Sequence, residues 1–151
     1  MAQWQLPEGM AIALAEARMA EENGEIPVGA AVMRNGTLIA AGHNRTIRDR
    51  DPTAHAEIVA IRAAAEALGN ARLSDCDLYV TLEPCAMCAG AISHARLARV
   101  YYAADDPKGG GVDHGAKVFN HPQCLHRPEV YSGIGAGEAA MLLRGFFARR
   151  R

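Results

Sequence analysis

Four side chains in two short segments can hold and use a metal ion. His55 and Glu57 lie in "DPTAHAEIVAIRAA", and Cys85 and Cys88 lie in "TLEPCAMCAGAI". Two cysteines three residues apart on a helix share one face, and the free N–H groups at a helix start favour thiolates. Thiolates and histidines are the usual ligands of zinc. The pattern therefore predicts a zinc site made by His55, Cys85 and Cys88.

The Cys-x-x-Cys pair has three chemical interpretations. A disulfide redox centre typically follows an early strand and has an aromatic neighbour, whereas this pair lies past the middle of the chain beside Met and Ala. A structural zinc site needs four protein ligands, often from a second such pair, and the sequence has none. A catalytic site needs three protein ligands and a water. We favour the catalytic interpretation, because His55 completes it, and keep the other two open.

Glu57 provides the catalytic interpretation with a proton carrier. A bound zinc lowers the pKa of its water toward ~7, and the resulting hydroxide needs a neighbour that moves its proton. Taken singly, Glu57 is a first-turn residue near the helix dipole, and His55 is a capping or buried histidine. Residues i and i+2 do not share a helix face, so the two converge only if His55 lies at or before the first turn. We expect Thr53 to be the N-cap that permits this.

The surrounding pattern predicts helices and strands in alternation. We expect helices at 8–22, 54–68, 85–96 and 137–150, and strands on both sides of Asn35-Gly36, at 77–82 and at 98–104. Asn-Gly between apolar runs indicates a hairpin, Gly69-Asn70 indicates a helix end, and Pro84 indicates a helix start. Residues 105–115 have the composition of a loop, and 116–128 are expected to hold one short helical turn.

This order of elements predicts an α/β protein. A strand–helix–strand unit gives a parallel pair with a right-handed crossover, and a hairpin gives an antiparallel pair. We therefore expect one mixed sheet with helices on both faces, a three-layer α/β/α sandwich. The 151 residues suit a single domain, 1–151. No apolar run approaches the ~20 residues that cross a bilayer. We expect a cytoplasmic protein in which Cys76 and Cys124 are reduced, small buried residues.

The charge distribution is uneven. A formal net charge of −1 argues against a broadly basic surface that coats nucleic acid. The C-terminal segment "LLRGFFARRR" nevertheless carries Arg144, Arg149, Arg150 and Arg151. Such a tail is either a solvated terminus or a local site for anions, and composition leaves both open.

The segments "HAE" and "PCAMC" resemble the H-x-E and P-C-x-x-C signature of zinc-dependent nucleoside and nucleobase deaminases. The resemblance implies one Zn²⁺ per chain, held by His55, Cys85 and Cys88. It also implies that a zinc-bound hydroxide attacks C6 of an adenine, that Glu57 shuttles the protons and that ammonia leaves. The implied fold is cytidine deaminase-like, with a mixed five-stranded sheet.

Longer segments resemble the bacterial tRNA-specific adenosine deaminases over nearly the whole chain, among them "GHNRTIRDRDPTAHAEIVAIR", "LYVTLEPCAMCAGAI" and "ARVYYAADDPKGGG". That family converts the wobble adenosine of an arginine tRNA anticodon to inosine and works as a homodimer. The resemblance implies a substrate-binding set of Asn44, Ala56, Asp106, Lys108, Phe147, Arg149 and Arg150. Asn44 would contact the flipped nucleoside, Asp106 and Lys108 would lie by the anticodon, and the C-terminal helix would contact the RNA.

Two rival functions stay open. A free nucleobase or nucleoside deaminase, acting on guanine or cytosine, would share the HAE and PCxxC core but would need a closed lid more than an arginine-rich helix. A catalytically inactive, zinc-stabilised RNA-binding module would have no use for Glu57. The homodimer has independent support, because "CAMCAGAISHA" is small and apolar nearly all round, more than one sheet face needs.

Overall fold

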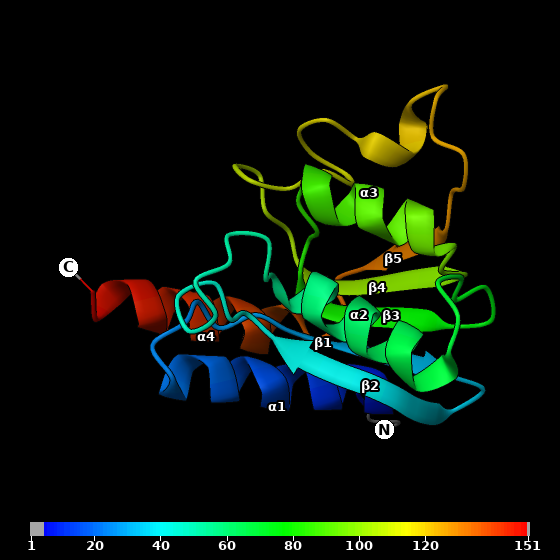
Figure 1. The fold of residues 1–151 in the computed structure, drawn as a ribbon. Helices are drawn as coiled ribbons and strands as arrows, with labels where there is room; N and C mark the ends of the chain where they lie inside the picture. Colours follow the sequence, from blue (N-terminus) through cyan, green and yellow to red (C-terminus); the bar gives the residue numbers. More distant parts are fainter. Residues whose placement is uncertain (1–4, 151) are drawn as a thin grey trace.

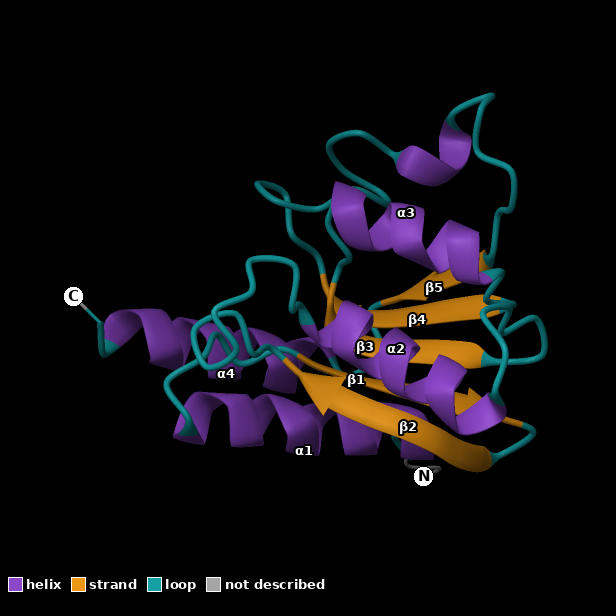
Figure 2. Ribbon diagram, viewed as in Figure 1, coloured by secondary structure: helices purple, strands orange, loops and turns teal. Residues whose placement is uncertain are grey.

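A computed structural model describes residues 5–150, which are built around one five-stranded sheet of order β2-β1-β3-β4-β5 (Figures 1 and 2). The strands are β1 Gly29–Arg34, β2 Thr37–His43, β3 Asp77–Leu82, β4 Arg99–Ala104 and β5 Glu129–Ser132. The helices are α1 Glu8–Glu22, α2 Ala56–Leu68, α3 Ala86–Ala95, the short 3-10 helix η1 Val118–Asn120, and α4 Ala136–Ala148.

The sheet is mixed and covered on both faces. Strand β1 is antiparallel to both β2 and β3, whereas β3, β4 and β5 run parallel. Helices α2 and α3 cover one face, and α1 and α4 cover the other (Figure 1). The predicted three-layer α/β/α sandwich with a mixed sheet is therefore confirmed.

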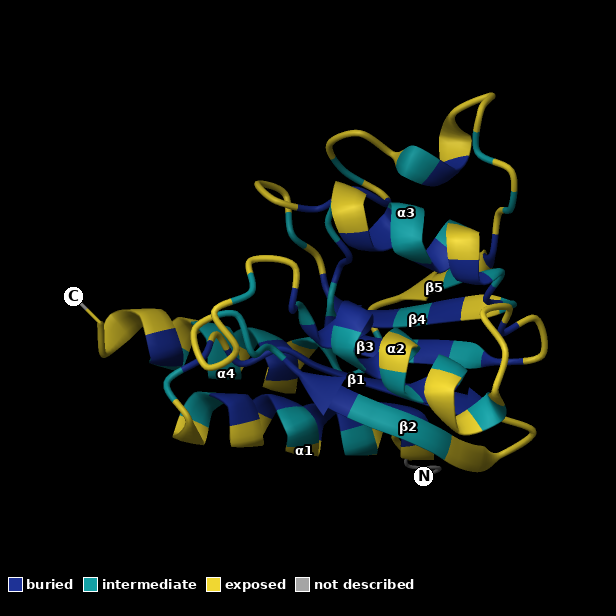
Figure 3. Cartoon of the chain, viewed as in Figure 1, coloured by how far each residue is buried: buried dark blue, intermediate teal, exposed yellow. Residues whose placement is uncertain are grey.

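The core divides into two parts, one on each side of the sheet. Each part lies beneath helices whose outer sides are exposed (Figure 3). Alternate residues of a strand point to opposite faces, so Val80 packs under α2 and α3 while its neighbour Tyr79 packs toward α1. Helix α1 packs so closely on β1 that a Cβ atom on Gly29 would come within 2.0 Å of the carbonyl oxygen of Ala13. Only glycine permits this approach.

The hairpin agrees with the sequence prediction. Asn35 and Gly36 have φ angles of 50° and 77°, the left-handed pair that a two-residue type I′ turn requires. The other predicted elements also form, with ends shifted by one or two residues: 54–68 begins at Ala56, 85–96 shortens to 86–95, and 137–150 becomes 136–148.

Strand β5 was not placed by the sequence patterns. It is a four-residue edge strand in which Glu129, Tyr131 and Ser132 are exposed, so it lacks the apolar alternation of a half-buried strand. Pairing with β4 and stacking of the Tyr131 ring on Tyr101, at 5.0 Å between ring centres, hold it in place. Across residues 5–150, no helix is long and apolar enough to cross a membrane.

Candidate active site

The three candidate metal ligands come from the starts of two neighbouring helices. His55 is the N-cap of α2 and Cys85 is the N-cap of α3, and both have extended backbone. Cys88 follows in the first turn of α3. His55 therefore precedes the first helical turn, which satisfies the geometric condition for it to converge with Glu57.

Thr53 was wrongly predicted to be the N-cap of α2. Its hydroxyl donates to Asp51 Oδ1 at 2.7 Å, so it stabilises a turn two residues before the helix. The N–H of Ala56 at the helix start donates instead to Asn44 Oδ1 at 2.9 Å. His55 thus occupies the N-cap position, and the side chain of Asn44, the residue after β2, accepts the free N–H at the helix start.

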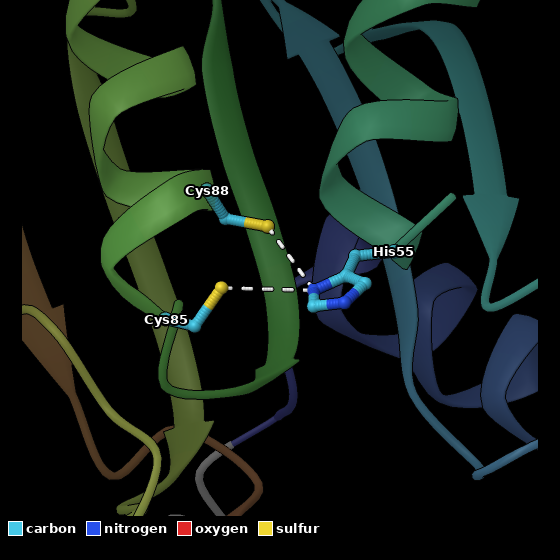
Figure 4. A group of neighbouring side chains, drawn as sticks. All are labelled: His55, Cys85 and Cys88. Atoms are coloured by element: carbon cyan, nitrogen blue, oxygen red, sulfur yellow. Dashed lines mark hydrogen bonds between the residues drawn. The ribbon is translucent and has the colours of Figure 1, made fainter. Parts of the chain in front are cut away.

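The three ligand atoms fit a zinc ion. His55 Nδ1 lies 3.6 Å from Cys85 Sγ and 3.5 Å from Cys88 Sγ (Figure 4). Zinc bonds of usual length would separate nitrogen and sulfur by about 3.6 Å across one edge of a tetrahedron. Within the described part of the chain the group has three ligands. Three ligands match a catalytic zinc site and fall short of the four in a structural one.

The protonation of the ligands also favours a cation. The hydrogen bond from Cys88, and then that with His55, lowers the pKa of Cys85 to about 4. The pKa of Cys88 is raised, first by its hydrogen bond to Cys85 and then by burial. One thiol of the pair is therefore ionised readily and the second only at a cost. A divalent cation removes this conflict, because it stabilises both thiolates.

Glu57 lies in the first turn of α2 and is buried, with 4% of its surface exposed. Burial raises the pKa of Glu57 to about 7, although its own backbone N–H and the charge of His55 favour the ionised form. A carboxyl group with a pKa near neutrality can both accept and donate a proton. Its position beside the ligands suits it to proton transfer.

His55, Cys85 and Glu57 line a cleft of about 310 Å³, and Cys88 is buried beside them. The other residues of its lining come from the loop before β1, the loop between β2 and α2, the end of β3 with the residue that follows it, and the loop after β4: Ile26, Val28, Asn44, Thr46, Leu82, Glu83, Asp106 and Gly109. The structure thus brings Asn44 and Asp106, two of the predicted substrate-binding residues, to the same cavity as the ligands.

Asn44 and Ala56 are joined to each other. Asn44 accepts from the Ala56 N–H, and its side-chain nitrogen donates to the carbonyl of Ile26 at 3.2 Å. Ala56 itself is fully buried. The side-chain nitrogen of Asn44 has a second hydrogen beyond the one given to Ile26. Substrate contact by either residue stays a prediction.

Asp106 and Lys108 lie in the loop after β4. The Asp106 carboxylate accepts from the backbone N–H groups of Lys108 and Gly109 at 3.3 and 2.9 Å, so it shapes a turn at the cleft edge. Lys108 is exposed on that turn. The two residues are close together as expected, and their contact with RNA stays a prediction.

The arginines at the end of the chain have partners within the protein. Arg149 forms an ion pair with Glu21 at the end of α1. Arg150 donates to the carbonyl of Gly24 at 3.4 Å, and its guanidinium lies 4.4 Å from the centre of the Phe146 ring. Phe147 is half exposed. The tail is therefore docked beside the loop that leads to the cleft, while Arg151 lies outside the described residues.

Several cleft residues were not predicted from the sequence, notably Thr46 and Glu83. Glu83 is a carboxylate between an apolar strand and Pro84, and such a buried charge at a strand end is a signal that could have indicated a role. The remaining cysteines lie elsewhere. Cys76 is buried as predicted, whereas Cys124 is only half buried and its thiol donates to the carbonyl of His126.

Comparison with known proteins identifies the family. Residues 5–104 match the profile described as the cytidine and deoxycytidylate deaminase zinc-binding region. The tRNA-specific adenosine deaminase of Agrobacterium fabrum is 55% identical over 142 residues, which cover 94% of this chain and 93% of that protein. The tRNA-specific adenosine deaminase of Bacillus subtilis is 42% identical, over 92% of this chain and 86% of its own.

The chain belongs to the tRNA-specific adenosine deaminase family. A solved structure from work on A-to-I editing by tRNA:A34 deaminases at the wobble position agrees with it at a TM-score of 0.88 and 55% identity, covering 89% of this chain and 98% of that one. A guanine deaminase from Nitrosomonas europaea has a TM-score of 0.76 at 28% identity, over 98% and 87% of the two chains. The cytidine deaminase-like fold and the zinc cofactor predicted from sequence are thereby confirmed, and the chain is a zinc-dependent hydrolytic deaminase.

Metal content tests the assignment of ligands. We expect about one zinc per chain in protein purified without chelator, and less than a tenth of that in His55→Ala and Cys88→Ala, because two remaining ligands bind zinc weakly. The measurement is elemental analysis of the purified chain. Cys124→Ala is the matched control and should keep its zinc. Full zinc content in either ligand variant would show that the ligands are assigned wrongly.

Proposed function

We propose that this chain deaminates the wobble adenosine of a tRNA anticodon to inosine. The observation that carries the proposal is the buried Glu57, which lines the cleft together with two members of the His55, Cys85 and Cys88 group, since a structural zinc site has no need of that carboxylate. The relatives named tRNA-specific adenosine deaminase support the substrate, because they match the chain over nearly all its length.

The proposed mechanism divides the work between ligands and proton carrier. His55, Cys85 and Cys88 would hold the zinc, which would supply the acidified water that acts as the nucleophile. Glu57 accepts a proton as the water oxygen bonds to C6 of the adenine, and it delivers that proton to the ring nitrogen N1. Glu57 then takes the second proton and passes it to the exocyclic amine as the C6–N bond breaks. Ammonia leaves and the ring becomes hypoxanthine.

The walls of the cleft are proposed to hold the nucleoside and its neighbours. The free hydrogen of the Asn44 amide suits an acceptor on the flipped nucleoside, and Ala56 contributes by fixing Asn44 through its N–H. Asp106 and Lys108 lie on the loop after β4, where they would contact the adjoining nucleotides. Bases in an RNA loop are already unstacked, so extruding one costs little.

The finer assignment is an arginine tRNA as the substrate. Phe147, Arg149 and Arg150 are proposed to contact its anticodon stem-loop, and the guanidinium of Arg149 is accessible despite its ion pair, with 62% of the side chain exposed. We further propose that residues 1–151 act as one deaminase domain in the cytoplasm, where tRNA is present.

A homodimer through α3 is part of the proposal. The outer side of α3 presents Met87, Gly90 and Ala91, of which Met87 is exposed. A hollow of about 290 Å³ lies between α3 and the segment around Leu125, whose side chain is 78% exposed. Small residues and exposed apolar side chains on one face suit a self-complementary contact.

Replacing Glu57 tests the mechanism. We expect Glu57→Gln to keep zinc and fold but to lose a factor of at least ~10² in kcat, since Gln has the shape of Glu but cannot cycle a proton. Ammonia release from an anticodon stem-loop measures kcat. Glu66→Gln, an exposed carboxylate on the same helix, is the control. A variant that retained a tenth of the wild-type rate would contradict the role of Glu57.

Three substrates test the proposed function itself. We expect rapid inosine formation in an anticodon stem-loop of arginine tRNA, and little reaction with free adenosine or free guanine, because most of the binding energy comes from the surrounding RNA. The assay compares kcat/KM for the three. Equal or greater efficiency with free guanine would replace the proposed substrate by a free base.

The arginine tail gives a prediction about salt. Arg149→Ala with Arg150→Ala should raise KM for the stem-loop more than it lowers kcat, and should reduce the salt dependence of binding by about one unit of slope per lost phosphate contact. The control is Arg34→Ala with Arg72→Ala, which removes equal charge beside a separate hollow. If the tail variant and wild type have the same KM and kcat at every salt concentration, the tail does not contact RNA and is only a solvated terminus.

The dimer has a direct test in sedimentation. We expect a mass of two chains at micromolar concentration for wild type, and a shift toward one chain for Ala91→Arg, because a long charged side chain on the outer side of α3 opposes close contact. The matched control is Ala67→Arg, at an exposed position of α2. A wild-type monomer at these concentrations contradicts the proposal.

A further inference from the structure

Two buried carboxylates that have no part in the proposed mechanism lie at the cleft, where Glu83 is part of the lining and Glu25 directly precedes the lining residue Ile26. Glu25 precedes β1 and is 1% exposed, and Glu83 follows β3 and is 2% exposed. Burying a carboxylate is costly unless polar groups surround it. The hydrogen-bond partners of these two carboxylates therefore show which parts of the structure each one stabilises.

Glu83 collects its hydrogen bonds from one loop. Its Oε1 accepts from the Asp106 N–H at 3.1 Å and interacts with His114 Nδ1 at 2.7 Å. Its Oε2 accepts from the N–H groups of Val112, Asp113 and His114 at 3.2, 2.9 and 3.1 Å. Five interactions thus fix the loop 105–115, which has no regular secondary structure of its own.

The glycines of this loop allow it to lie against Glu83 and the metal-binding helix. A Cβ atom on Gly110 would come within 2.4 Å of Glu83 Oε2, and one on Gly111 within 2.5 Å of the Ala86 nitrogen. The N–H of Gly111 also donates to the carbonyl of Pro84 at 2.7 Å. The loop 105–115 is thus held against Glu83 on one side and the start of α3 on the other.

Glu25 accepts hydrogen bonds from the loop between β2 and α2, as Glu83 does from the loop 105–115. Its Oε2 accepts from the N–H of Arg48 at 2.9 Å, and its Oε1 from Ile47 N–H and the Thr46 hydroxyl at 3.2 and 3.4 Å. Thr46 lines the cleft. The partners of Glu25 therefore belong to a cleft wall, as those of Glu83 do.

We propose that Glu25 and Glu83 are positioning residues that set substrate affinity by holding the two cleft walls in their binding positions. The inference rests on the proposed function. Groups that contact a substrate must be held to within ~0.5 Å by supporting hydrogen bonds. Since the walls contact substrate away from the reacting carbon, loss of either carboxylate weakens binding more than chemistry.

The experiment compares Glu25→Gln and Glu83→Gln with the control Glu66→Gln. An amide group in place of either carboxylate directs N–H donors against backbone N–H groups, so it releases the loop while keeping the volume. We expect both variants to keep their zinc content. Amide hydrogen exchange should become faster only in residues 44–54 for Glu25→Gln and only in residues 105–115 for Glu83→Gln. We also expect KM for the stem-loop to rise about tenfold or more with kcat within about threefold.

A milder variant guards against misfolding. His114→Ala removes one partner of Glu83 and leaves the carboxylate in place, so it should show faster exchange in 105–115 and a smaller rise in KM. If all three variants keep wild-type exchange in the loops, or if they lower kcat with KM unchanged, the inference is overturned. Faster exchange over the whole chain in His114→Ala would also overturn it, because the interaction would then support the fold as a whole.

The experiments distinguish a failure of the proposed function from a failure of the positioning role of Glu25 and Glu83. If wild-type protein does not deaminate the stem-loop, the tRNA assignment falls, and amide exchange still decides whether the two carboxylates hold the walls. If the stem-loop is deaminated and KM does not respond to any variant, the function stands and the inference falls.

Discussion

The site depends on bringing two helix starts to within a few ångströms of each other. Strand β1 lies between β2 and β3 and is antiparallel to both, so β2 and β3 run in the same direction and end at the same edge of the sheet. Helices α2 and α3 begin after those two ends and cover the same face. His55 and Cys85, each at an N-cap, therefore meet over the edge of the sheet. The positive ends of two helix dipoles add to the field that favours thiolates there.

Electrostatics makes this arrangement specific for a cation with a proton carrier beside it. Two adjacent thiols cannot both ionise easily, since the ionised Cys85 raises the pKa of Cys88. Burial meanwhile raises the pKa of Glu57 into the range useful for proton transfer. A divalent metal would stabilise both thiolates, and the role proposed for the carboxyl next to it is proton transfer to and from the substrate. The same few groups thus explain both the metal and the chemistry.

The chemical core alone does not choose a substrate, because a guanine deaminase shares the fold. Discrimination must come from the walls and from what lies around them. In this chain Glu25 accepts hydrogen bonds from the loop between β2 and α2, and Glu83 accepts them from the loop 105–115. Arg150 of the C-terminal segment donates to the carbonyl of Gly24, directly before Glu25. The ion pair of Arg149 with Glu21 orders the tail, and a phosphate would have to compete with that carboxylate for the guanidinium.

The sequence by itself determined the ligand types, the helix starts that carry them, the hairpin at Asn35-Gly36 and the layered α/β architecture. These follow from local rules: turn conformation, capping, and the period of apolar residues act over a few neighbouring positions. The tertiary structure alone decided that the Asn44 side chain, and not Thr53, accepts the N–H at the start of α2, that an exposed four-residue segment becomes β5, and that Glu83 holds a loop about thirty residues away. Each of these depends on a hydrogen bond or a stacking contact between residues distant in the chain, and such a contact leaves no periodic pattern in the sequence.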